Sequence, residues 1–344
     1  MISSTTDPYL KAVPLIQHAQ RIVVTAHKSP DGDAVGSSLG LAKYLIKKGK
    51  DVTVVLPDGF ADFLNWMPGT EDIKYYDKDT AEVESLLNEA DLIFCLDYND
   101  ISRVGKMRGA MEALIGQKSF ILIDHHQHPQ DFPDVLISDT SSCSTAQLIF
   151  RFIDRMGDRV YLDKEIGACL YCGIMTDSGS FRFPSVDEET HQIAAEIIKL
   201  GVDHAQIHRN VYDTNLLDRL RLVGYALSEK LVVLPEYRTA YISLSAEELT
   251  RFNYRPGDTE GLVNQALSIK GVNFAAFIRE GNNEVKLSLR SQGSFKVNEV
   301  AATYFNGGGH NNAAGGATTK PLEAVVQQFN EILPQYKEEL NYDL

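Results

Sequence analysis

The feature that most constrains the fold is a set of short apolar runs that each end in acids or histidines. RIVVTAH, DLIFCLD and SFILIDHH have the length and continuous apolarity of strands in a parallel sheet that is covered on both faces. They lead into His27, Asp97 and the pair Asp124-His125, respectively. Ligands of open α/β sheets bind beyond the carboxyl ends of the strands. We therefore expect a functional site at that edge.

Helical patterns alternate with these strands. AVGSSLGLAKYLIKKG has helical spacing and ends at Gly49, and DVTVVLP indicates one more strand. AEVESLLNEA and RVGKMRGAMEALIG fit the crossover helices that join parallel strands. The first half of the chain therefore predicts an α/β domain with an open, mostly parallel sheet.

The second half predicts a smaller α/β domain. Three charged, helix-like stretches run from Asp187 to Glu229, and two hairpin patterns follow, LVVLPEYRTAYISL and VNFAAFIREGNNEVKLSLR, the second turning at residues 281–283. The glycine-rich segment NGGGHNNAAGG comes next, and a closing amphipathic helix is expected from about Leu322 to Leu340. The predicted parts are a first α/β domain, a helical connector and a second α/β domain, at residues 1–190, 191–229 and 230–344.

Charge and composition narrow the class of function. The net charge of −14 argues against a broad basic surface for long duplex nucleic acid. It leaves room for a short anionic substrate, because metal ions and a few arginines can make a local cationic pocket.

The composition also indicates the compartment. No apolar run is long enough for a bilayer, and the N-terminus lacks a signal-peptide pattern. Four cysteines are too few for a disulfide framework, so we expect the protein in the cytoplasm. CLYC lacks a second ligand pair and predicts a buried helix face.

The segment HKSPDGD concentrates potential ligands in seven residues. Pro30 and Gly32 break regular structure, so that His27, Asp31 and Asp33 can turn towards a common point. Taken alone, an Asp-Gly-Asp run equally fits a surface turn, and an acid after a strand equally fits a helix cap. The coincidence of several such segments at the ends of strands in one sheet favours a functional site.

The combination of side chains indicates the kind of site. Asp177 adds an acid where the apolar run of GIMTDSGSFRF gives way to a Gly/Ser loop. Carboxylates with imidazoles suit Mn²⁺ better than structural zinc, which favours thiolates. The acids and histidines exceed the needs of one ion, since positions must stay open for water and substrate. Two ions about 3.5–4 Å apart, as in enzymes that hydrolyse phosphoesters, would account for them.

Five motifs, in order, resemble the signatures of the DHH phosphoesterase family. HKSPDGD, the aspartate of DYND, the DHH triplet and the acid of TDSGSF resemble four motifs of its catalytic domain. NGGGHNNAAGG resembles the glycine-rich signature of the DHH-associated C-terminal domain. The resemblance covers nearly the whole chain, and the length is most similar to the two-domain group that combines oligoribonuclease and pAp phosphatase activities.

The resemblance implies a role for each residue of the first domain. Asp97 would bridge two Mn²⁺ ions, Asp124 would orient a ligand, and His126 would face the substrate phosphate and assist the leaving oxygen. Arg103 either takes part in catalysis or pairs with a nearby carboxylate. The ligands implied for the first ion are His27, Asp31 and Asp97, and those for the second are Asp33, Asp97, His125 and Asp177.

The resemblance also implies how the second domain contributes. Arg290 and His310 are similar to the substrate-binding residues of the family. Gly307, Gly308 and Gly309 would let the backbone approach an anion closely, with N–H groups that form an anion-binding nest. The alternative for these glycines is a plain tight connection before a helix.

The implied activity is metal-dependent hydrolysis, by in-line attack of an activated water on phosphorus. The implied substrates are short oligoribonucleotides, degraded to mononucleotides, and pAp, dephosphorylated to AMP. Two alternatives share this chemistry: a phosphodiesterase for cyclic di-AMP or pApA, and a hydrolase of inorganic polyphosphate or pyrophosphate. A silent nucleotide-binding module is disfavoured because every expected metal position is filled. A homodimer is a further hypothesis.

Overall fold

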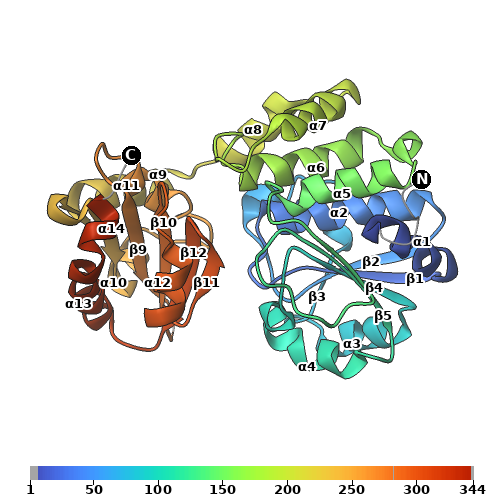
Figure 1. The fold of residues 1–344 in the computed structure, drawn as a ribbon, viewed down its shortest axis with the longest axis horizontal. Helices are drawn as coiled ribbons and strands as arrows, with labels where there is room; N and C mark the ends of the chain where they lie inside the picture. The colour runs from blue at the N-terminus through green and yellow to red at the C-terminus, as the bar shows by residue number, and fades with distance from the viewer. Residues whose placement is uncertain (1–6, 282, 342–344) are drawn as a thin grey trace. The chain divides into compact units, whose positions relative to one another are not determined.

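The chain divides between Thr214 and Asn215 into two compact units, which we call unit 1 and unit 2 (Figure 1). The structure is a computed structural model, and it describes residues 7–281 and 283–341. No helix within those residues combines the length and the apolarity that crossing a bilayer requires.

Unit 1 is built around a six-stranded sheet in which every pair of neighbouring strands is parallel, in the order β3-β2-β1-β4-β5-β6. Its elements are α1 (Pro8–His18), β1 (Arg21–Thr25), α2 (Gly32–Lys47), β2 (Asp51–Leu56), β3 (Lys74–Tyr75), α3 (Thr80–Glu89), β4 (Leu92–Leu96), the 3-10 helix η3 (Ile101–Met107), α4 (Arg108–Leu114), β5 (Ser119–Asp124), β6 (Val135–Ser138), α5 (Thr145–Arg155), α6 (Lys164–Asp177), α7 (Glu188–Lys199) and α8 (His204–Tyr212).

Helices cover both faces of this sheet, as Figure 1 shows for α2, α5 and α6 on one side and α3 and α4 on the other. Successive residues of β1 therefore enter different cores: Ile22 and Val24 pack with the first group of helices, and Val23 packs with the second. The strand order reverses between β1 and β4, and ligands of doubly wound sheets bind outside such a point.

Helices α2 and α6 approach each other closely because glycines lie where they meet. A Cβ atom on Gly36 would lie 2.4 Å from the carbonyl oxygen of Cys169, so only glycine fits at this distance. The same approach brings Asp33, in the first turn of α2, against Gly173 of α6, where a Cβ would lie 2.8 Å from the Asp33 Oδ1 atom. The packing of these two helices thus positions an acid that the sequence singles out.

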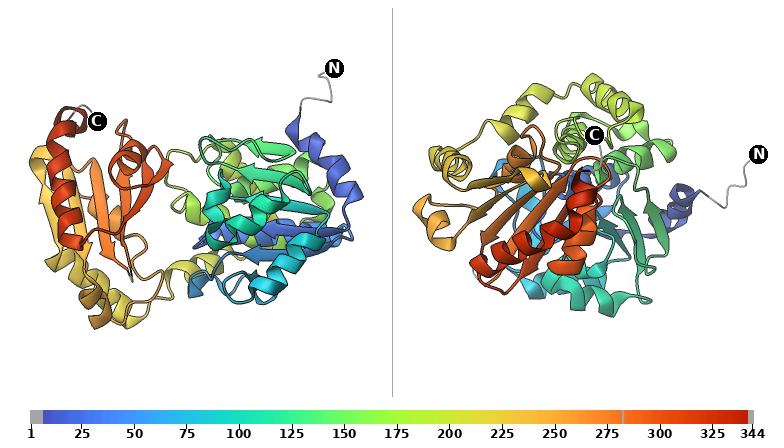
Figure 2. Two further views of the ribbon diagram at one scale, coloured as in Figure 1. Left: turned by 90° about the horizontal axis from the view of Figure 1, so that it is seen from below. Right: turned by 60° about the vertical axis from the view of Figure 1, so that its left-hand side comes forward.

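Unit 2 contains a second six-stranded sheet, in the order β11-β12-β10-β9-β8-β7, in which β8 and β9 are parallel and the other pairs antiparallel. Its helices cover both faces (Figure 2). Its elements are α9 (Leu217–Glu229), β7 (Leu231–Leu234), β8 (Thr239–Leu244), α10 (Ala246–Arg251), α11 (Leu262–Leu267), β9 (Phe274–Glu280), β10 (Val285–Ser291), α12 (Val297–Tyr304), β11 (Gly308–His310), β12 (Ala313–Thr318), α13 (Leu322–Ile332) and α14 (Lys337–Asn341).

The predicted fold class is confirmed: a parallel sheet in the first part of the chain and a smaller α/β part after it. Both predicted hairpins form, although the turn of the second includes residue 282, which lies outside the described residues. Cys169 and Cys172 are buried in α6, as expected from the CLYC pattern.

Two local expectations were wrong. The closing helix is not continuous, because Pro334 cannot donate a backbone hydrogen bond: α13 ends at Ile332, and a 3-10 turn precedes α14. The crossover helix expected in RVGKMRGAMEALIG is α-helical only from Arg108, since Gly105 adopts φ 58° and ψ −125°. The glycine-rich segment forms the hairpin of β11 and β12, so the alternative of a plain connection before a helix does not hold.

The contact between α2 and α6 generates the first prediction. Gly36→Ala should lower the free energy of unfolding by about 1–3 kcal/mol, because the new methyl group meets backbone atoms that cannot move aside. Gly109→Ala is the matched control: Gly109 is an exposed glycine in α4 with open space around its Cα, so alanine should be neutral or stabilise by up to about 1 kcal/mol. Urea denaturation measures both; equal stabilities for the two variants would contradict the close contact.

Candidate active site

The acids and histidines predicted to act together lie at the carboxyl edge of the unit 1 sheet. His27 follows β1 and Asp97 follows β4, the two strands at which the strand order reverses. Asp124 ends β5, His125 comes directly after it, and Asp177 ends α6. All of them except Asp177 are at most 7% exposed, so this edge buries an unusual number of ionisable groups.

Two histidines present the same ring nitrogen to the acids. The His27 Nδ1 atom lies 2.9 Å from the carbonyl oxygen of Lys28, and the His125 Nδ1 atom lies 3.1 Å from that of Ser142. A carbonyl oxygen only accepts hydrogen bonds, so both Nδ1 atoms donate, and the Nε2 atoms face the carboxylates. The His27 Nε2 atom lies 3.4 Å from Asp97 Oδ2. This is the arrangement in which an imidazole ligates a metal through Nε2.

The carboxylate of Asp97 faces both histidines. Its Oδ2 atom is on the side of His27, and its Oδ1 atom lies 3.6 Å from the His125 Nε2 atom. The Thr145 hydroxyl donates to the same Oδ1 atom at 3.0 Å. Asp97 has φ 62°, a left-handed conformation that non-glycine residues rarely adopt. Strain of this kind persists only where the surroundings fix it, and it gathers at functional sites.

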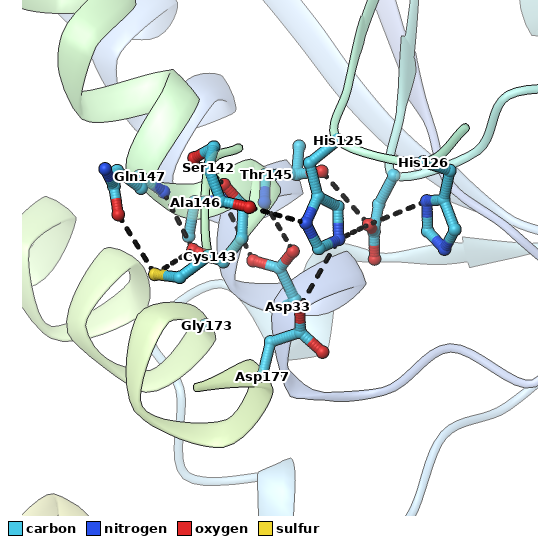
Figure 3. A network of polar contacts seen from close by, with 12 residues as sticks. Asp33, His125, His126, Ser142, Cys143, Thr145, Ala146, Gln147, Gly173 and Asp177 are labelled. Atoms are coloured by element: carbon cyan, nitrogen blue, oxygen red, sulfur yellow. Dashed lines mark hydrogen bonds and ion pairs between the residues drawn. The ribbon is translucent and has the colours of Figure 1, made fainter. Parts of the chain in front are cut away.

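Helix N-termini hold the acids of the HKSPDGD segment. Asp31 caps α2, accepting from the backbone N–H groups of Asp33 and Ala34 at 3.0 and 3.1 Å. Asp33 in turn accepts from the first residues of α5: Thr145 N–H donates to Oδ2 at 2.6 Å and Ala146 N–H to Oδ1 at 2.8 Å (Figure 3). Each oxygen of Asp33 therefore keeps a lone pair for a further partner.

Figure 3 shows Asp33, Asp177 and His125 turned towards one another, with His126 beside them. The His125 Nε2 atom lies 3.3 Å from Asp177 Oδ2. His126 contacts a different acid, since its Nδ1 atom lies 2.7 Å from Asp124 Oδ1. Asp124 is fully buried, and its Oδ2 atom has no hydrogen-bond partner among the described residues. A buried carboxylate oxygen without a partner is costly, so this site suits an added cation or donor.

The buried acids and imidazoles shift one another's pKa values. Burial disfavours the charged imidazole of His27, but the hydrogen bond to Asp97 and the charge of Asp31 outweigh burial and raise the pKa of His27 to about 9. Burial raises the pKa of Asp33 well above its usual range, and the charges of Asp97 and Asp177 raise it further. Burial likewise raises the pKa of Asp177 to about 6. These acids resist ionisation until positive charge arrives, a condition that a divalent cation meets.

The donor atoms form compact groups that fit metal ions. Three groups in unit 1 each bring one nitrogen or oxygen per residue within 4.8 Å of the others: His27 with Asp31 and Asp97, Asp33 with His125 and Asp177, and Asp97 with Asp124 and His126. The donor chemistry is imidazole nitrogen with carboxylate oxygen, and no thiol takes part. Together with the unpartnered Asp124 oxygen, these groups fit divalent cations such as Mn²⁺.

In unit 2, the structure places Arg290 and His310 on one face of the sheet. Arg290 of β10 is paired in register with Ala313 of β12, and Ala313 is paired with His310 of β11. Residues directly opposite each other across a sheet share a face, so the two side chains flank the small Ala313. The hairpin requires glycine at positions 307 and 309, because Cβ atoms there would lie 1.9 and 2.6 Å from carbonyl oxygens of β12.

Several residues at the edge of the unit 1 sheet escaped the sequence analysis. Thr145 and Ser142 hold Asp97 and His125, and Asp58, after β2, accepts from the Ser29 N–H group at 2.6 Å. The pattern SSCSTAQ carries a helix-cap signal at Ser144, which predicts the start of α5 but not its contact with another segment.

Comparison with known proteins adds an independent finding. The family model for the DHH family, N-terminal domain, matches residues 21–174, and that for the DHHA1 domain matches residues 238–341. The bifunctional oligoribonuclease and PAP phosphatase NrnA of Thermus thermophilus is 32% identical, over 93% of this chain and 90% of that protein. An exopolyphosphatase-related protein from Bacteroides fragilis, known from a crystal structure, has a TM-score of 0.92 and 44% identity, covering 97% of each chain.

A more distant structure shares the fold alone. RecJ from Thermus thermophilus in complex with Mn²⁺ has a TM-score of 0.54 and 15% identity, covering 97% of this chain and 55% of that one.

The fold, the site and these similarities define a hydrolase that acts on phosphoester bonds. The chain belongs to the DHH family, with the DHH domain followed by the DHHA1 domain.

The hydrogen bond from Thr145 to Asp97 generates a prediction. Thr145→Val keeps the shape of the side chain but removes the hydroxyl, so Asp97 loses the partner that fixes its orientation. If Asp97 binds a divalent cation, the affinity for Mn²⁺ should fall about 10- to 100-fold. Thr145→Ser retains the hydroxyl and should stay within about threefold of the wild type. Titration calorimetry of the metal-free protein with Mn²⁺ gives both values, and an unchanged affinity in Thr145→Val would refute the positioning role.

Proposed function

We propose that this chain dephosphorylates pAp to AMP and degrades short oligoribonucleotides to mononucleotides, with two Mn²⁺ ions at the edge of the unit 1 sheet. The observation that carries the proposal is the position of Asp97, whose two carboxylate oxygens face His27 of one donor group and His125 of another. The substrates follow from the relative in Thermus thermophilus, which is named for these two activities and is similar over nearly its whole length.

The geometry of Asp97 supports a bridging role. One carboxylate oxygen faces His27 of the first donor group, and the other faces His125 of the second, so Asp97 lies between these two imidazoles. We assign His27, Asp31 and Asp97 to one ion, and Asp33, Asp97, His125 and Asp177 to the other. Bound ions would stabilise the charge on the phosphoryl oxygens and lower the pKa of the attacking water.

The residues of the chain supply orientation and proton transfer around that chemistry. Asp124 fixes the ring of His126 through Nδ1. We assign to His126 the transfer of a proton to the departing oxygen. Asp33 is fixed by the N-terminus of α5 and Asp97 by Thr145. Because these partners are already in place, binding needs little rearrangement of the ligands.

We assign substrate recognition to unit 2. Arg290 can form paired hydrogen bonds with phosphate oxygens, and His310 on the same face can donate to phosphate or stack on a base. The backbone of Gly307 and of the β11 glycines offers N–H groups at the edge of this surface, although Gly307 and Gly309 are already required by the hairpin.

A second candidate function is hydrolysis of inorganic polyphosphate. The observation that favours it is the similarity to the exopolyphosphatase-related protein, which covers 97% of each chain. A substrate panel with Mn²⁺ separates the candidates: pAp, short RNA, pApA, cyclic di-AMP, polyphosphate and pyrophosphate. We expect the highest kcat/KM for pAp and short RNA. A higher value for polyphosphate or for a cyclic dinucleotide would replace the proposed substrates.

The donor groups predict that metal removal abolishes activity and lowers stability. Chelation leaves buried acids without their counterions, so the melting temperature should fall and hydrolysis of pAp should stop. Adding Mn²⁺ should restore both. In Asp97→Asn, which weakens both groups at once, add-back should restore neither fully. Activity that survives chelation would rule out the two-ion proposal, and unchanged melting would show that the acids need no cation.

The shared face of Arg290 and His310 predicts selective losses. Arg290→Ala and His310→Ala should each lower kcat/KM for pAp and short RNA about 10- to 100-fold while bound metal stays constant. A chromogenic phosphodiester without a nucleoside should lose less than about fivefold. Lys286→Ala is the matched control, because Lys286 lies on the same face of β10 and pairs with Glu284 at 3.4 Å. Equal losses on all substrates, with loss of metal, would assign these residues a structural role instead.

A further inference from the structure

Two basic side chains, Lys28 and Arg103, lie beside the donor groups without being part of them. Lys28 directly follows His27, and its backbone N–H group donates to the carbonyl oxygen of Arg103 at 2.8 Å. This bond joins the segment after β1 to the 3-10 helix η3, which follows β4 and contains Arg103. Because η3 follows Asp97 and Lys28 follows His27, the bond brings both basic residues next to segments that carry donors of the site.

The backbone holds Lys28 in a defined place. Its stem lies on Gly105 of η3, so closely that a Cβ on Gly105 would be 3.3 Å from the Lys28 Cδ atom. Gly105 has a positive φ, which favours glycine at the point where the lysine packs. Ser29, the residue after Lys28, has φ 53°, and its N–H group donates to the Asp58 carboxylate. Lys28 therefore packs on η3, whereas its neighbour His27 faces Asp97.

Both side chains are exposed, and neither forms an ion pair or a side-chain hydrogen bond within residues 7–281 and 283–341. Some lysines elsewhere in unit 1 do have carboxylate partners: Lys43 pairs with Glu165 at 2.8 Å, and Lys47 pairs with Asp163 at 2.5 Å. In a chain of net charge −14, two neighbouring cations without carboxylate partners beside a buried acidic site are free to bind an anion from outside.

We propose that Lys28 and Arg103 form a subsite for the phosphate adjacent to the one that is cleaved. The inference rests on the proposed function, because the donor groups would bind the scissile phosphate. In pAp the adjacent group is the 5′-phosphate, and in an oligoribonucleotide it is the neighbouring phosphate of the backbone. Guanidinium gives paired hydrogen bonds and ammonium a compact charge, a combination that suits the anionic oxygens of a phosphate monoester or diester. Arg103 is then a binding residue and takes no part in the chemical step.

The test compares two ligands that differ by one phosphate, pAp and 3′-AMP. For the wild type with Mn²⁺, the KM for pAp should be lower than that for 3′-AMP. In Lys28→Met/Arg103→Met, the KM for pAp should rise about 10- to 100-fold, with kcat within about threefold, whereas the kinetics of 3′-AMP should change less than about threefold. Lys118→Met is the matched control, since Lys118 precedes β5 at the opposite edge of the sheet, and it should change neither.

Binding to the Ca²⁺-loaded protein, measured by titration calorimetry with pAp and 3′-AMP, gives a readout that needs no turnover. Failure of the wild type to hydrolyse pAp and RNA would sink the proposed function alone. The subsite stands if calorimetry still shows tighter binding of pAp than of 3′-AMP and the double variant removes that difference. It falls if the wild type binds both equally, or if the variant keeps the preference. It also falls if kcat for both substrates drops equally at unchanged KM, which would make Arg103 catalytic.

Discussion

The burial of several carboxylates at one sheet edge is the constraint on which the rest of unit 1 depends. Asp33, Asp97 and Asp124 are at most 2% exposed, and an unpaired charge at such depth is too costly to keep. Each acid therefore has a dedicated partner: the N-terminus of α5 for Asp33, two imidazoles and a hydroxyl for Asp97, and His126 for Asp124. Because these partners come from separate segments of the chain, the acids tie those segments together.

The backbone is strained at one of these acids and close to it, and packing elsewhere in unit 1 stabilises the fold. Asp97 and Ser29 both have left-handed backbones, which cost of order 1–3 kcal/mol each. The Asp97 N–H group still donates to the carbonyl oxygen of Ile123, so the strained residue remains fixed to the neighbouring strand. The close contact of α2 with α6 supplies stability away from the edge. The arrangement fits a site whose ligands are positioned before any ion or substrate binds.

The sequence predicted the parts of the site that depend on local order. Strand ends are visible as apolar runs, and the carboxyl edge of a parallel sheet collects whatever follows them, so the placement of His27, Asp97 and His125 could be predicted. Thr145 and Asp58 could not, because their contacts cross 48 and 29 positions of the chain and depend on how helices and loops pack. The break of the closing helix at Pro334 was missed, although the sequence contains its signal, since proline interrupts a helix by itself. The kink at Gly105 could not be predicted, because glycine adopts positive and negative φ with similar ease.

The two units use different means to place their functional side chains. In unit 1, donors reach one edge from separate strands and helices, so each needs its own fixing contact. In unit 2, Arg290 and His310 share a face because antiparallel pairing aligns both with Ala313. If β12 shifted by one residue relative to its partners, side chains that now share a face would lie on opposite faces. The register therefore decides whether Arg290 and His310 can act together. The close approach that only Gly307 and Gly309 allow fixes that register. The glycines thus hold Arg290 and His310 on one face, which the recognition proposed for unit 2 requires.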